Sequence, residues 1–93
     1  MKVAGWKGVI LLNFKVGNVT HYYDKIKVAV VELSGDLAVG EKVKFVRGGE
    51  DLFEQNLDQM QMEHKKITLG KKGEIVAIKT DKEVKAGAEV FKI

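Results

Sequence analysis

The chain has 93 residues, 45% of them hydrophobic and 31% charged, and 16 lysine and arginine residues against 13 acidic residues give a net charge of +3. This length leads us to expect one domain with a single core rather than a multidomain enzyme. The lack of cysteine excludes a disulfide-built secreted scaffold. Since no apolar run approaches the ~20 residues that cross a bilayer, we expect a cytoplasmic domain without membrane contact.

Residues 1–13 differ from the rest, because a tryptophan between two lysines precedes a short apolar run at residues 8–12. The run is too short for a signal peptide, and no small-residue cleavage site follows it. We expect an N-terminal arm or edge strand here. Alternatively, the segment contacts another protein chain by pairing with an open sheet edge. On that interpretation the interface residues are Trp6, Val9, Ile10 and Leu11.

Residues 14–93 have the pattern of β-strands, with Val, Ile, Phe and Tyr at alternate positions and turn residues at short intervals. The apolar parity changes between Val16 and Val19, and the intervening Gly17 predicts a β-bulge. The run at residues 26–33 is apolar at both parities. It therefore predicts a strand that is covered on both faces.

The parity counted on from Val19 places Tyr23 on the core side of its strand. A glycine pair at residues 48–49 predicts a hairpin turn, because glycine accepts the positive φ that such turns need. One long strand is expected from residue 51 to about residue 64. A second change of parity, near residues 58–59, predicts a bend within it.

Between these segments, Val43 and Phe45 alternate with lysines and predict a strand with one face toward the core. No window of 12 residues has a convincing helical period. We therefore predict an all-β fold in which residues 14–93 form a small six-stranded closed barrel. Closure is favoured because it removes exposed strand edges.

Four segments combine glycines and aliphatic residues at characteristic spacings. They are Gly17-Asn18-Val19, residues 33–45 with the pattern G-x-L-x-x-G-x-x-V, residues 53–60, and residues 72–90. In this order they resemble domain 2 of translational GTPases such as elongation factor Tu, whose β-barrel the resemblance implies for residues 14–93. Residues 19–23 and 60–65 are most similar to small elongation-factor-like proteins. Residues 53–60 also resemble a strand in the C-terminal barrel of collagenase-like peptidases.

Neither resemblance brings catalytic machinery to this chain. The sequence has no G-x-x-x-x-G-K-[ST] phosphate loop, so we expect no GTP binding. The peptidase resemblance covers an accessory domain, so protease activity is not implied. His21 and His64 lie on different predicted strands without a metal-ligand spacing, and Ser34 lies in a turn without an identifiable base. We therefore expect no enzyme activity, no metal and no cofactor.

Lysines and aromatic residues gather around several predicted turns, where rings can stack on bases and cations can contact phosphates. The leading hypothesis is a binding module for structured RNA, such as tRNA or rRNA, or for a ribosome-associated or other translation protein. It requires the turns to meet at one rim of the barrel. The alternative for these lysines is a merely solubilising role. The candidate residues are His21, Tyr22, Lys25, Lys27, His64, Lys65, Lys66, Lys71 and Lys72.

The second functional hypothesis is a protein–protein interaction module, such as an accessory partner of a peptidase-like enzyme. It would use the apolar segment at residues 6–12 or an open sheet edge rather than the lysines. The two hypotheses differ in their expected sensitivity to nuclease and to salt.

Overall fold

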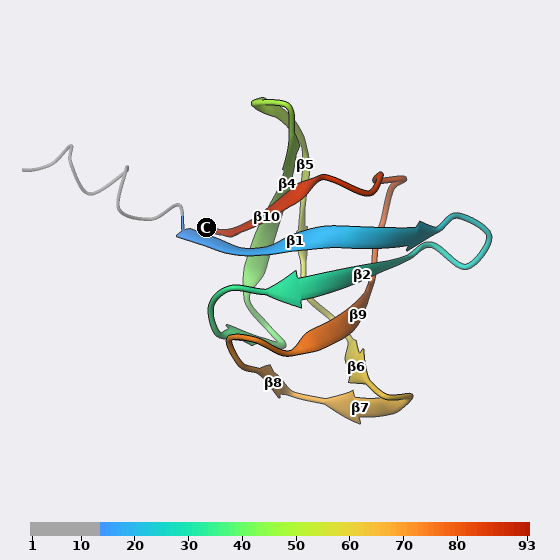
Figure 1. Ribbon diagram of the computed structural model, residues 1–93, viewed down its shortest axis with the longest axis vertical. Helices are drawn as coiled ribbons and strands as arrows, with labels where there is room; N and C mark the ends of the chain where they lie inside the picture. Colours follow the sequence, from blue (N-terminus) through green and yellow to red (C-terminus); the bar gives the residue numbers. More distant parts are fainter. Residues whose placement is uncertain (1–13) are drawn as a thin grey trace, which may run out of the picture.

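The computed structural model describes residues 14–93, and these residues form β-strands and turns without a helix (Figure 1). The all-β prediction is confirmed. Within the described range, no helix is present that could span a membrane. The strands are β1 (Phe14–Tyr23), β2 (Val28–Leu33), β3 (Leu37–Ala38), β4 (Lys42–Arg47), β5 (Glu50–Asn56), β6 (Met60–Met62), β7 (Lys65–Ile67), β8 (Leu69–Gly70), β9 (Ile75–Lys79) and β10 (Glu89–Lys92).

Eight of these strands form one antiparallel sheet in the order β5-β4-β10-β1-β2-β9-β6-β7, and β3 pairs with β8. The predicted closure into a six-stranded barrel is not confirmed. In the described part of the chain no ladder joins the end strands, β5 and β7. The strands β5 and β6 follow one another along the chain but pair with different neighbours, β4 and β9. The sheet therefore bends around the core without a closing ladder.

The predicted bend near residues 58–59 falls at a break between two strands rather than within one: residues 57–59 belong to no strand and separate β5 from β6. A buried side chain links β5 to the end of β9 at this bend. Gln55 is 6% exposed; its Nε2 donates to the Lys79 carbonyl oxygen at 2.9 Å, and its Oε1 accepts from the Asp81 backbone N–H at 2.8 Å. These two hydrogen bonds connect strands that no backbone ladder joins.

The core lies on the inner side of the bent sheet and combines alternate residues of its strands with buried residues of β3 and of the connecting loops. Its largest fully buried apolar side chains are Phe45, Leu37, Leu57, Met60 and Ile78. The Phe45 ring packs against the half-buried Phe53, with 4.9 Å between ring centroids. The predicted inward position of Phe45 is therefore confirmed.

The predicted bulge at Gly17 is confirmed, because the register of β1 against β10 shifts between Lys15 and Gly17. A second shift, against β2 between Val19 and His21, was not predicted. It reverses the parity of the following residues. Tyr22 therefore packs against the core, whereas Tyr23 is 53% exposed, so the prediction for Tyr23 is wrong.

Two further predictions need correction. The strand β2 is not covered on both faces: its inward residues are buried, but Val28 and Val30 are only half-buried and the preceding Ile26 is 59% exposed. The long strand predicted to reach residue 64 instead turns at Glu63 and His64, between β6 and β7. Both residues have positive φ, 53° and 67°, as a two-residue type I′ hairpin requires. Neither is glycine or asparagine, so the sequence carried no turn signal there.

Candidate functional site

The outer face of the sheet over β2, β9 and β6 carries aliphatic side chains. Directly opposed residues of antiparallel neighbours have their side chains on the same face. The pairs His21–Val30, Val30–Ala77, Ala77–Gln61 and Gln61–Lys66 therefore make one row across five strands. The row is apolar in its centre and polar or basic at its ends.

Two parallel rows flank this one. On one side Tyr23, Val28 and Lys79 are opposed across β1, β2 and β9, and on the other side Glu32 is opposed to Ile75. The Ile75 side chain is 57% exposed, although isoleucine is among the residues most often buried. The central aliphatic area is thus continuous along β2 and β9.

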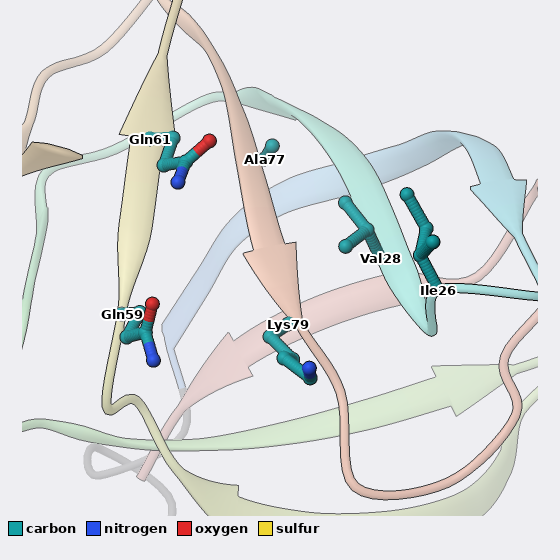
Figure 2. A pocket seen from close by; sticks show the side chains of 6 residues that line it. All are labelled: Ile26, Val28, Gln59, Gln61, Ala77 and Lys79. Carbon is teal, nitrogen blue, oxygen red and sulfur yellow. The ribbon is translucent and has the colours of Figure 1, made fainter. Parts of the chain in front are cut away.

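Two adjoining hollows lie in this face. Figure 2 shows the first, about 240 Å³ in volume and lined by Ile26, Val28, Gln59, Gln61, Ala77 and Lys79. The second, about 190 Å³, is lined by Val30, Gln61, Glu63, His64, Ile75, Val76 and Ala77. Both hollows are lined by Gln61 and Ala77 and therefore adjoin, and together we call them the outer groove. The small side chain of Ala77 forms its floor between larger neighbours.

The polar groups of the outer groove have few partners within the domain. Gln59 and Gln61 lie two residues apart, and both amide side chains line the first hollow (Figure 2). The hydrogen bonds between described residues do not involve either amide. The ion pairs of residues 14–93 engage four other lysines, so Lys79 has no carboxylate partner among them. The groove therefore offers two amides and one ammonium group to a ligand.

No group of three or more His, Asp or Glu residues within 14–93 could hold a metal ion. The buried hydroxyl of Thr80 is within hydrogen-bond distance of the Lys27 carbonyl at 3.3 Å and of the Tyr22 hydroxyl at 3.4 Å. It therefore supports the turn between β1 and β2.

The structure brings only part of the predicted basic site together. His21 and Lys66 end the central row, and His64 lines the outer groove. Tyr22 packs on the core instead, and Lys65 follows the turn on β7, next to Lys66. The predicted interface residues Trp6, Val9, Ile10 and Leu11 lie outside the described residues.

The requirement that the basic turns meet at one rim is not fulfilled. Lys25 and Lys27 lie in the turn that precedes β2. The turn with Lys71 and Lys72 packs against the other end of β2, where the Gly73 N–H donates to the Leu33 carbonyl at 2.9 Å. The length of β2 therefore separates the two groups.

The sequence did not identify Gln59, Gln61 and Ala77 as groove residues. The signal that could have located the groove was the run of residues 26–33, which is apolar at both parities.

The fold is similar to that of a domain from another protein. No family model matches the chain. An uncharacterized protease of Methanocaldococcus jannaschii is 32% identical over 77 residues, which are 83% of this chain but 19% of that protein. The C-terminal domain of a Geobacillus thermoleovorans protein described as a U32 peptidase superimposes with a TM-score of 0.79 and 19% identity, over 87% of this chain and 92% of that domain. Its selenomethionine variant gives a TM-score of 0.76 and 18% identity, over 82% and 95%.

These findings correct the leading functional hypothesis. The similar proteins are a protease and a U32 peptidase C-terminal domain, so the interpretation as an RNA-binding, elongation-factor-like protein of translation is wrong. The resemblance to the C-terminal barrel of collagenase-like peptidases is supported. Glycine-spaced hairpins indicate a fold, and one fold serves many functions, which explains why they misled the functional interpretation. The chain corresponds to about a fifth of its curated relative, 19% of that protein's length.

Proposed function

We propose that this domain is a non-catalytic interaction module of a peptidase and that it contacts polypeptide through the outer groove. The observation that carries the proposal is an aliphatic groove that residues 14–93 leave uncovered, on a domain with the fold of a peptidase C-terminal domain. Exposed apolar areas with a polar rim are typical of interaction sites. The proposal develops the second hypothesis from the sequence and moves its surface from residues 6–12 to the sheet.

The aliphatic residues of the outer groove supply the driving force for binding. Ile26, in the turn before β2, and Ile75, on β9, are more than half exposed, and Val28 and Val30 on β2 line the groove with them. Covering a fully exposed aliphatic side chain contributes roughly 1.5–3 kcal/mol. The half-exposed side chains here therefore favour a bound protein surface by several kcal/mol in total, before the cost of ordering the partner.

The free edge of β5 is a less suitable surface for an apolar partner. It carries Glu50, Asp51 and Glu54, and the last two form ion pairs with lysines of β4. Charged side chains on an edge strand oppose pairing with another chain. The outer groove has no comparable row of charges.

Photo-crosslinking of the full chain in a lysate of its native cells tests this function. A photoreactive amino acid replaces Gln61 in the groove or, as a matched control, the exposed Ala86 outside it. We expect position 61, and not position 86, to capture a peptidase polypeptide or its protein substrate, unaffected by nuclease and by moderate salt. Equal capture at both positions, capture that requires nucleic acid, or no capture at position 61 would overturn the proposal.

A further inference from the structure

We propose that the outer groove binds one extended stretch of polypeptide, with aliphatic side chains at alternate positions and an acidic side chain beside Lys79. This inference rests on the interaction module proposed above and assigns its ligand. It follows from the length of the groove, the spacing of its amides, its aliphatic walls and its charge.

The length of the groove suits a short extended segment. Lys79, Ala77 and Ile75 are the outward residues of β9, and they follow each other at every second position. At roughly 3.3 Å per residue of strand, the distance from the first to the last is about 13 Å. A ligand in the same extended conformation covers this distance with about five residues, as β9 itself does.

The two groove amides match the repeat of such a ligand. Gln59 and Gln61 stand at alternate positions of their segment, and a side-chain amide offers both an N–H donor and a carbonyl acceptor. In an extended chain the peptide groups that point the same way also recur every two residues, about 6.6 Å apart. Each glutamine can therefore serve one peptide group of a chain that lies along the groove. A helix, with a rise of about 1.5 Å per residue, does not present this repeat.

The walls of the groove accept aliphatic side chains of the ligand. Ile26 and Val28 line the first hollow, Val30 and Ile75 line the second, and Ala77 lies under both. The alternation of an extended ligand directs every second side chain into the groove. Its two inward positions therefore fill the two hollows.

The charges along the groove determine where it favours an acidic side chain of the ligand. Lys79 lines the first hollow, in which no acidic residue is found, and it has no ion-pair partner within residues 14–93. The acidic groove residue, Glu63, lies in the second hollow. An acidic side chain is thus favoured at the Lys79 end and disfavoured at the other. Because the hollows adjoin at Gln61 and Ala77, we assign the carboxylate to a side chain of one segment that passes over both rather than to a chain end.

Binding of synthetic peptides to the full chain tests the inference. The probe is a decapeptide with an acetylated N-terminus and an amidated C-terminus. Val and Leu occupy its alternate positions, and a single Asp follows the last of these aliphatic residues. Companion peptides carry Lys in place of Asp, N-methyl groups on two alternate backbone amides, or Asn in place of Asp with a free C-terminal carboxylate. Fluorescence anisotropy gives each Kd, and NMR shifts identify the residues contacted.

We expect the Asp peptide to bind and to shift the side-chain amides of Gln59 and Gln61. The Lys and N-methyl peptides should each bind at least about fivefold more weakly. No binding of the Asp peptide, equal binding of the Asp and Lys peptides, or shifts confined to another face would overturn the inference. If the Asn peptide with a free C-terminal carboxylate binds as tightly as the Asp peptide, the groove recognises a chain end. That result would also overturn the inference.

Matched variants locate the site. Ala77→Phe fills the floor of the groove and should weaken the Asp peptide at least about tenfold, whereas Ala86→Phe outside the groove should leave its Kd unchanged. Lys79→Glu should abolish the preference for Asp over Lys, whereas the exposed control Lys82→Glu should retain it. If Ala77→Phe fails to fold, the Lys79→Glu swap still decides. If the peptides do not bind but position 61 still captures a polypeptide in the crosslinking experiment, this ligand is rejected and the interaction module is retained.

Discussion

Truncation of Gln55 to alanine tests how the bent sheet is held together where no ladder closes it. The wild-type side chain donates to the Lys79 carbonyl and accepts from the Asp81 N–H at 2.9 and 2.8 Å. Gln55→Ala removes both bonds and leaves a carbonyl and an N–H beside a residue that is 6% exposed. The end of β9, including the groove residue Lys79, then loses its connection to β5.

The expected loss of stability follows from these two bonds. Leaving a buried polar group without a partner costs about 1–3 kcal/mol. Lys79 and Asp81 are both exposed residues, so water reaches part of the freed backbone and values near the lower limit apply to each group. We therefore expect Gln55→Ala to lower the free energy of unfolding by about 2–3 kcal/mol. In a domain of this size that corresponds to a Tm lower by roughly 10–20 °C.

Urea and thermal unfolding of the full chain measure this loss, and Asn56→Ala provides the control on the adjacent exposed position of β5. The control should change stability by no more than about 0.5 kcal/mol. Amide hydrogen exchange gives a local readout, since the Asp81 N–H should lose protection in Gln55→Ala relative to its global stability. A loss below about 0.5 kcal/mol, or unchanged protection at Asp81, would show that Gln55 does not join β5 to β9.

Three further predictions concern the backbone and the core. In Gly17→Ala the new Cβ would lie 2.6 Å from the Val31 side chain and 2.8 Å from the Glu32 carbonyl oxygen. We therefore expect urea unfolding to show a free energy of unfolding lower by about 2 kcal/mol or more. Gly35→Ala is the control and should be nearly neutral, because its nearest atom would be 3.7 Å away. Replacing Glu63 by Asn and His64 by Gly together should raise the free energy of unfolding by about 1 kcal/mol, because both φ values are positive; an unchanged or lower Tm would contradict this. Phe45→Ala should cost about 3–5 kcal/mol, and a loss below about 1 kcal/mol would show that this ring is not central to the core.

The sequence by itself determined the fold class and most of the core. Alternation around Val43 and Phe45 required one buried face, because successive strand residues point to opposite sides. The glycine at position 17 and the parity change near residues 58–59 marked the bulge and the bend for the same local reason. These features depend on neighbours within a few residues, so one strand suffices to predict them.

The features that the sequence could not predict depend on which strands pair with one another. The shift in β1 after Val19 arises against β2 and exchanges Tyr22 for Tyr23 on the core side. The hairpin at Glu63 and His64 forms without the Asn-Gly or Asp-Gly pair that favours such a turn. There the pairing of β6 with β7 and β9 outweighs local backbone preference.

The candidate site likewise depended on tertiary structure. The outer groove combines residues of β2, β6 and β9 that lie up to about fifty positions apart, and their spacing in the sequence shows no motif. An apolar run such as residues 26–33 shows how many side chains are apolar, not which face another layer covers. Only the arrangement of the strands revealed that one face of β2 meets the core and that no other described residue covers the opposite face, because burial is a property of the packed sheet and not of the strand alone.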